Sequence, residues 1–149
     1  MNAKRVILGG LLAGLVLNIG ETILNIPVVG AQMDAALQTL GLPKMSGATI
    51  GLFVLMCFGL GILCTWLYAA IRPRFGAGPR TAVIAGIVVW LLVSVWVNVA
   101  SAAMGTFPFR LLAIVMAWQL VEIPLATMAG AYVYREEAAV VEERVPAIH

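Results

Sequence analysis

Residues 46–71 read SGATIGLFVLMCFGLGILCTWLYAAI, an apolar run that contains no charged side chain. A helix needs about 20 mostly apolar residues to cross a bilayer, and this run is long enough to do so. The whole chain has the same character, because 62% of its 149 residues are hydrophobic and only 11% are charged. Roughly a quarter of the residues of a soluble globular protein are charged. The composition therefore excludes a water-soluble globule and predicts one all-α membrane domain over residues 1–149.

Three more apolar runs are long enough to cross a bilayer. The predicted spans are about residues 6–30, 46–71, 81–107 and 109–134, followed by a charged tail at 135–149. The first run is not a signal peptide, because the apolar core of a signal peptide has about 7–15 residues. We therefore expect a polytopic protein built as a four-transmembrane-helix bundle.

Basic residues predict the direction of these spans, because cytoplasmic loops are enriched in Lys and Arg. They gather at residues 4–5, in the turn at 72–80 and at Arg135, three places that four spans put on one side. The opposite loops contain only Lys44 and Arg110. We expect both termini to be cytoplasmic in a multi-pass protein of the bacterial cytoplasmic (inner) membrane.

The loop at 31–45 between the first two spans has a pattern of its own. Its apolar residues follow helical spacing at Met33, Ala36, Leu37 and Leu40. Such spacing predicts an amphipathic helix, here a short one lying on the outer surface. Gly41 is expected to end it, because glycine is the usual residue after a helix C-terminus.

The few polar residues of the spans fall on stripes with helical spacing, which predicts that they face the interior of the bundle. Small and polar residues of the first span recur at Gly10, Gly14, Asn18, Glu21 and Asn25. Those of the third span recur at Gly86, Trp90, Ser94, Asn98, Ser101 and Gly105. The predicted proton, ion or ligand site comprises Glu122, Glu21, Asn18, Asn98, Gln119 and Trp118. We expect a cavity that opens outward, with Arg110 at its mouth.

Glu122 is the most informative residue of this set. It lies near the middle of the fourth span, and Pro124 follows it closely. A proline within a helix cannot donate to the carbonyl four residues earlier, here that of Leu120. Burial at this depth disfavours the charged form of a carboxyl. Two interpretations stay open, a protonatable functional site and a neutral carboxyl that joins helices by hydrogen bonds.

Several chemistries have no residues to perform them. Cys57 and Cys64 are too far apart on one helix to form a disulfide, and the single histidine is His149. No nucleophile has a recognisable base beside it, and no metal-binding spacing is present. The sequence therefore predicts no enzyme, no metal and no cofactor. Trp90, Trp96 and Trp118 lie inside the spans and either pack there or line a ligand cavity.

Short motifs resemble a family of small four-helix bacterial membrane proteins with a domain of unknown function. They include Leu40-Gly41-Leu42, the junction 107–112 with Phe-Pro-Phe-Arg-Leu-Leu, and Met128-Ala129-Gly130. The family favours aromatic residues where this chain has Gly20-Glu21-Thr22, and often histidine near the position of Gln119. The resemblance implies the four-helix fold and covers most of the chain, but it brings no activity with it.

The leading functional hypothesis is a small proton- or cation-linked transporter, or a channel-like protein, that uses Glu122 and Glu21. We expect it to act as a homo-oligomer, because four helices enclose little volume. One alternative is a non-catalytic accessory or assembly subunit of a larger membrane complex, and another is a lipid- or pigment-binding membrane protein. The lipid bilayer is a predicted partner in every case, whereas nucleic acid is not, because the basic residues form no patch.

Overall fold

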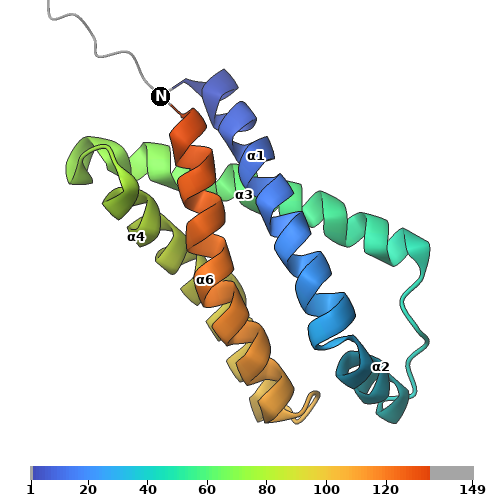
Figure 1. Cartoon of the computed structure of the whole chain (residues 1–149). Coiled ribbons are helices and arrows are strands. Elements are labelled where there is room, and N and C mark those ends of the chain that lie inside the picture. Colours follow the sequence, from blue (N-terminus) through green and yellow to red (C-terminus); the bar gives the residue numbers. More distant parts are fainter. Residues whose placement is uncertain (1, 135–149) are drawn as a thin grey trace, which may run out of the picture.

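The computed structural model describes residues 2–134, so the predicted tail at 135–149 lies outside the described residues. This part of the chain is helical and contains no strand. Its elements in order are α1 Ala3–Ile23, the π-helical turn η1 Leu24–Val28, α2 Gly30–Thr39, α3 Gly47–Phe75, α4 Pro79–Trp90, the π-helical turn η2 Leu91–Val95, α5 Trp96–Ala103 and α6 Phe109–Val133 (Figure 1).

Four helical segments are long and apolar enough to cross a membrane, as the sequence predicts. They are Ala3–Val28, Gly47–Phe75, Pro79–Ala103 and Phe109–Val133. The second is longer than predicted, because α3 continues through Pro73 to Phe75. The third begins with Pro79 at its first helical position, where proline's missing N–H has no helical partner to lose.

The predicted end of the third span at residue 107 is wrong, since α5 ends at Ala103. Gly105 has a φ of 67°, which places it in the left-handed region that closes a helix. Its N–H donates to the Ala102 carbonyl, and that of Thr106 donates to the Ser101 carbonyl. Gly105 therefore ends the helix and does not belong to a packing stripe as predicted.

The predicted helix between the first two spans is confirmed as α2, which is shorter than the loop that contains it, and Leu40 of its predicted apolar face follows the helix and is exposed. Gly41 ends it as expected, with a φ of 69° and a hydrogen bond from its N–H to the Gln38 carbonyl. Ala36 of α2 packs with Leu24, Val29 and Leu111, so α2 closes one end of the core. This contact joins α2 to the start of α6.

The first span is not one uninterrupted α-helix, contrary to the prediction. α1 ends at Ile23 and the chain continues as the wider turn η1, which contains Pro27. Proline has no N–H to donate, so the regular α-helical bond is lost at this position. The N–H of Val29 reaches back five residues to the Leu24 carbonyl instead. A second wide turn, η2, interrupts the third span and buries Ser94.

Glycines hold α1, α3 and α6 together where these helices cross. A Cβ on Gly61 of α3 would collide with the backbone of Gly10 and Gly14 on α1. A Cβ on Gly9 would lie 2.5 Å from the Gly130 carbonyl oxygen of α6. Small residues allow such close approach, and the resulting van der Waals contact drives helix association in membranes. The glycines of the first predicted stripe therefore have a packing role.

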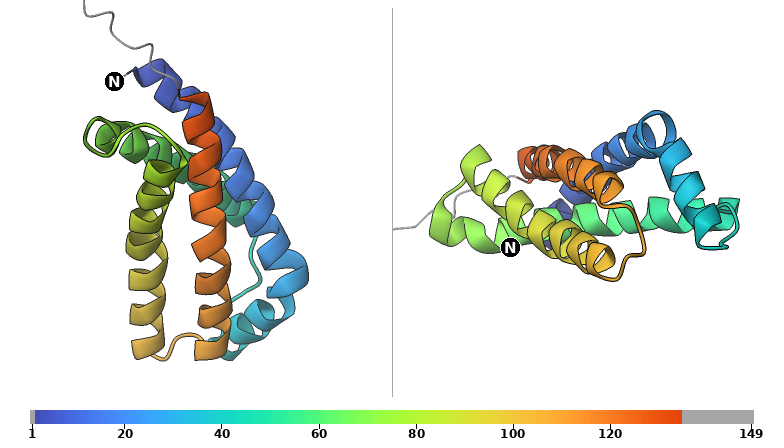
Figure 2. Two further views of the ribbon diagram at one scale, coloured as in Figure 1. Left: turned by 60° about the vertical axis from the view of Figure 1, so that its left-hand side comes forward. Right: turned by 90° about the horizontal axis from the view of Figure 1, so that it is seen from below.

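The fourth span packs against the third span at its proline. A Cβ on Gly86 of α4 would lie 2.6 Å from the Cα of Pro124 on α6. Figure 2 shows α4, α5 and α6 running side by side, whereas α3 crosses behind α1 and α6 at a steep angle. The first half of α3 therefore extends away from the bundle, and its apolar residues 50–56 are exposed.

Candidate functional site

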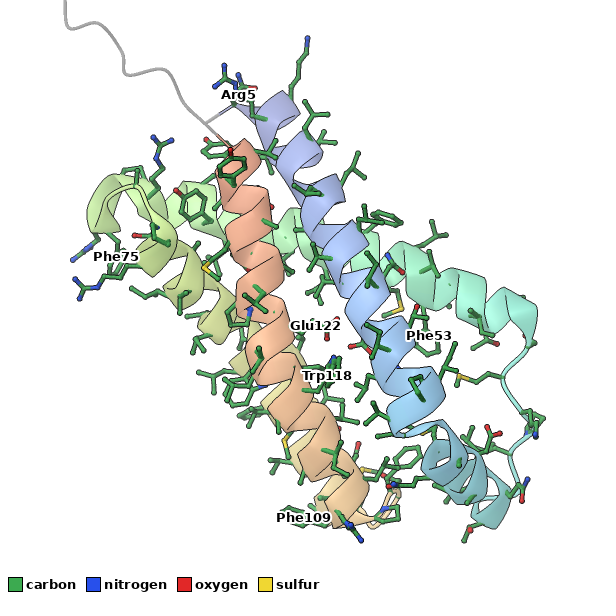
Figure 3. All side chains as sticks on the ribbon, viewed as in Figure 1. Arg5, Phe53, Phe75, Phe109, Trp118 and Glu122 are labelled. Carbon is green, nitrogen blue, oxygen red and sulfur yellow. The ribbon has the colours of Figure 1, made fainter. Side chains whose placement is uncertain are left out.

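Two carboxyl groups lie between α1 and α6. Glu21 is in the last turn of α1, and Glu122 is near the middle of α6. Glu122 and Trp118 both point from α6 toward α1 (Figure 3). Glu122 is 6% exposed, so it is a buried acid in a chain that has few polar side chains inside.

Each oxygen of the Glu21 carboxyl accepts a hydrogen bond from a side-chain amide. Its Oε1 atom accepts from the Gln119 Nε2 atom at 2.6 Å, and its Oε2 atom accepts from the Asn25 Nδ2 atom at 2.8 Å. The Asn25 amide also donates to the Glu21 backbone carbonyl at 2.9 Å. A carboxylate only accepts hydrogen bonds, so it matches this pair of amide donors. The bond from Gln119 connects α6 to α1.

Glu122 has the opposite surroundings. Both of its carboxyl oxygens are buried and have no hydrogen-bond partner within residues 2–134. The carboxyl lies directly against Gly20, where a Cβ on the glycine would collide with its Oε1 atom. The indole N–H of Trp118, one helical turn away, lies beside this carboxyl but is buried without forming a hydrogen bond to it or to any other group among these residues. An unpaired buried polar group is costly, which makes this the least satisfied position in the described core.

The two carboxyls are close enough to repel each other when both are charged. The Cys57 thiol of α3 lies within electrostatic range of both. No titratable side chain occurs between residues 81 and 107, so the third span adds none to the site. The pair is therefore surrounded by amides, an indole, a thiol and apolar groups, with no cation at its depth in the described chain.

The two predicted asparagines do not bond to the carboxyls. The Asn18 Nδ2 atom donates to the Gly14 carbonyl at 2.8 Å and to the Val54 carbonyl at 3.3 Å, so Asn18 connects α1 to α3. The Asn98 Nδ2 atom donates to the Ser94 carbonyl of its own span. Glu21, Glu122, Gln119 and Trp118 thus form the centre of the predicted site, and the asparagines satisfy the backbone elsewhere.

Arg110 lies apart from the carboxyl pair. It is exposed and lines a cavity of about 320 Å³ between α2 and the start of α6. In the described chain it makes no ion pair with Glu21, whose two oxygens are bonded to amides. The ion pair of this region joins Lys44 to Asp34 at 3.4 Å.

The three tryptophans of the spans have different surroundings and do not line one shared cavity. The Trp90 indole donates to the Met116 carbonyl at 3.0 Å and so connects α4 to α6. Trp96 is 78% exposed on the outside of the bundle, so the expectation that it packs or lines a cavity is wrong. Trp118 alone adjoins a carboxyl.

Gly20 is a site residue that the sequence prediction missed. It lies on a second stripe of the first span, Gly9, Ala13, Leu17, Gly20 and Leu24, with spacings of four, four, three and four. This stripe contains the most buried side chains of α1, and Gly9 and Gly20 on it approach α6. The spacing alone would have placed this glycine on an interior face of the first span, but not opposite Glu122.

Within residues 2–134, no three side chains of His, Cys, Asp or Glu converge to hold a metal ion. The fold and the site define a helical protein with four potential membrane spans and a buried carboxyl pair. No family model, curated protein or solved structure matches the chain, so the family resemblance stays a prediction.

Proposed function

We propose that the chain is a multi-pass protein of the bacterial cytoplasmic membrane that links proton movement to transport, with Glu122 as the group that binds and releases the proton. The observation that carries the proposal is the contrast between the two carboxyls. Glu21 has a donor on each oxygen, whereas Glu122 has none among the described residues. An acid at mid-membrane without a partner is a candidate for a proton site.

The orientation of the spans follows from charge. The first residues of α1, the turn 72–80 and the end of α6 lie at one end of the bundle (Figure 3). The described chain ends also meet, since the Asn2 N–H donates to the Tyr134 hydroxyl at 3.4 Å. Lys4, Arg5, Arg72, Arg74 and Arg80 cluster at this end, which the positive-inside rule assigns to the cytoplasm.

Protonation of Glu122 would control the contact between α1 and α6. The neutral acid fits against Gly20, because it brings no charge into a space where no group forms a hydrogen bond to it. The ionised acid would be an unpaired buried charge beside Glu21, and it would be more stable after moving toward water. Loss of the proton would therefore weaken the contact at Gly20, and binding of a proton would restore it.

The test uses the full chain in liposomes that contain a pH-sensitive dye. With wild-type protein, a proton gradient should acidify the interior of the liposomes, which the dye reports. Glu122→Gln should abolish this acidification while the protein stays folded. Glutamine keeps the shape of the neutral acid but cannot ionise. Glu21→Gln is the matched control and should retain part of the flux, because Glu21 has a positioning role. Equal flux for wild type and Glu122→Gln would refute the proposal.

The alternative function, an accessory subunit of a larger membrane complex, has one observation in its favour. The exposed apolar residues 50–56 of α3 extend beyond the bundle and would suit a neighbouring membrane helix. Purification in mild detergent discriminates the two functions. A homo-oligomer without other subunits supports transport, and stoichiometric co-purifying subunits support the accessory role.

A further inference from the structure

The indole N–H of Trp118 is a buried donor with an acceptor beside it, and the two groups are not hydrogen-bonded. Trp118 and Glu122 are four residues apart on α6, so their side chains project from the same face of the helix. Both point toward α1 (Figure 3). Within residues 2–134, neither the indole N–H nor either carboxyl oxygen has a hydrogen-bond partner. Complementary buried groups that stay unpaired side by side need a physical explanation.

We propose that Trp118 is the positioning residue for the ionised carboxyl of Glu122, and that its indole N–H binds the carboxylate once the proton has left. The inference rests on the proposed function, because it assigns a residue to the step in which Glu122 loses its proton. The neutral carboxyl lies against Gly20 of α1. When its O–H bond breaks, the proton passes to water, the negative charge stays on the carboxyl, and the carboxylate turns along α6 to accept from Trp118.

The geometry of α6 favours this movement. Side chains on a helix lean toward its N-terminus, so the Glu122 side chain leans toward the turn that contains Trp118. The indole already lies beside the carboxyl, so rotation about the side-chain bonds of Glu122 brings an oxygen to the N–H without a shift of the helix. A hydrogen bond to a charged group is stronger than one to a neutral group. The contact therefore forms when the proton leaves, and the neutral acid stays against Gly20.

The other donors of this region are already engaged in the described chain. The backbone N–H of Glu21 lies near the Glu122 carboxyl, but the α-helix directs it to the carbonyl four residues earlier. The side-chain amides of Asn25 and Gln119 donate to Glu21. The titratable groups that face Glu122 are Glu21 on α1 and the Cys57 thiol on α3, and residues 81–107 contribute none. Since neither of these groups is a cation, the indole N–H is the group left to stabilise the carboxylate.

Nuclear magnetic resonance of the indole groups tests this contact directly. The full chain has four tryptophans, so isotope-labelled protein in detergent micelles should give four indole resonances, which are assigned by replacing each tryptophan in turn with phenylalanine. The Trp118 resonance should move downfield in one step as the pH is raised, because a hydrogen bond to a carboxylate deshields the proton. The step should be absent in Glu122→Gln. A Trp118 resonance that stays constant with pH, or that moves equally in Glu122→Gln, would overturn the proposal.

Trp90 is the internal control for this measurement. Its indole N–H already donates to the Met116 carbonyl at 3.0 Å, so its resonance should not respond to pH. The measurement does not involve transport, so it separates this inference from the proposed function. Loss of flux in Glu122→Gln without a response of Trp118 would refute the role of Trp118 alone. A response of Trp118 that requires Glu122, together with equal flux in wild type and Glu122→Gln, would support the contact and refute the proposed function.

Two variants measure what the contact contributes to transport. Trp118→Phe keeps an aromatic ring and removes the donor, so proton flux in liposomes should fall about tenfold, the factor expected for one hydrogen bond to a charged group. Trp90→Phe loses its bond to the Met116 carbonyl and should be less stable, but it should retain most of the flux. Wild-type flux in Trp118→Phe, or an equal loss of flux in both variants, would overturn the proposal. The resonance of wild-type Trp118 decides the question even if Trp118→Phe fails to fold.

Discussion

The two halves of α1 contact their neighbours by different means. Its first half approaches α3 and α6 through glycines, so closely that backbone meets backbone. Its last turns approach α6 through Glu21, Gln119 and the carboxyl of Glu122, and there the chain changes to the wide turn η1. The first half is close-packed, and the second faces the carboxyl of Glu122 on α6, which has no hydrogen-bond partner among the described residues. The contacts of α1 therefore differ in quality along the helix, and unpaired polar groups such as those opposite its second half usually persist only where a site needs them.

The largest expected effect is on the glycine contact. Gly61→Leu should destabilise the protein by about 3 kcal/mol or more, because its side chain would overlap the backbone of Gly10 and Gly14. No rotamer change relieves a collision with backbone. Unfolding of the purified protein by denaturant in detergent measures the loss.

The control for this prediction lies on the same helix. Gly51 has nothing within 4 Å of its Cβ position, so Gly51→Leu should not destabilise the protein, and the higher helix propensity of leucine should stabilise it by up to about 1 kcal/mol. Similar losses in Gly61→Leu and Gly51→Leu would show that the first half of α3 is packed as tightly as the second, and the contrast between the regions would fail.

A smaller effect is expected where α1 and α6 meet through polar groups. Gln119→Met keeps the length of the side chain but removes the donor to the Glu21 Oε1 atom. It should cost about 1–2 kcal/mol, the cost of leaving a half-buried charged acceptor without its partner. Asn98→Leu should cost less, because the Asn98 amide bonds only to a carbonyl of its own span. The same denaturation curves measure both variants. A larger loss of stability in Asn98→Leu than in Gln119→Met would show that the important polar contacts lie on the third span.

The sequence predicts the spans well, because the length of an apolar run is a local property. It also predicts the end of α2, since Gly41 can adopt the positive φ that closes a helix. It fails at residue 105 for a related reason: Gly105 fits the spacing of a packing stripe and that of a helix end equally well. Only the hydrogen bonds of the finished helix distinguish the two roles.

The sequence predicts which residues belong to the candidate site, but not which of them contact each other. Helical spacing brings Glu21, Gln119 and Glu122 to interior faces, and the structure joins the first two. Which helix faces which depends on the crossing of α3 behind α1, a long-range property that no local pattern encodes. Asn18 therefore meets the Val54 carbonyl of α3 and not a carboxyl. Gly20 was missed for the same reason, because its role depends on Glu122 lying opposite it on another helix.

Gly20→Ala tests the contact between the second half of α1 and Glu122, and it should have little effect on stability. The new methyl group would displace the end of a flexible side chain, the Glu122 carboxyl, and the gain in helix propensity of about 1 kcal/mol offsets that cost. Proton flux in liposomes should nevertheless fall, because the carboxyl can no longer rest against α1. Gly9→Ala is the matched control in the other half. Its methyl group would meet the Gly130 carbonyl oxygen, so it should destabilise the fold. Unchanged flux in Gly20→Ala would remove this contact from the mechanism.

The last prediction involves the smallest change in stability. It tests which side of the membrane each half of α1 faces. Lys44 is 73% exposed, and its ion pair with Asp34 contributes about 0.5 kcal/mol or less, so Lys44→Cys should fold normally. In intact cells, with Cys57 and Cys64 replaced by alanine, a membrane-impermeant maleimide should label Lys44→Cys. It should label Ala77→Cys only after the membrane is opened, because Ala77 lies in the arginine-rich turn expected in the cytoplasm. The opposite labelling pattern would show that the protein has the opposite orientation in the membrane. The polar half of α1 would then face the cytoplasm, and the arginine-rich turn would face outward. The Glu122 proposal would keep its site and change only the direction of proton entry.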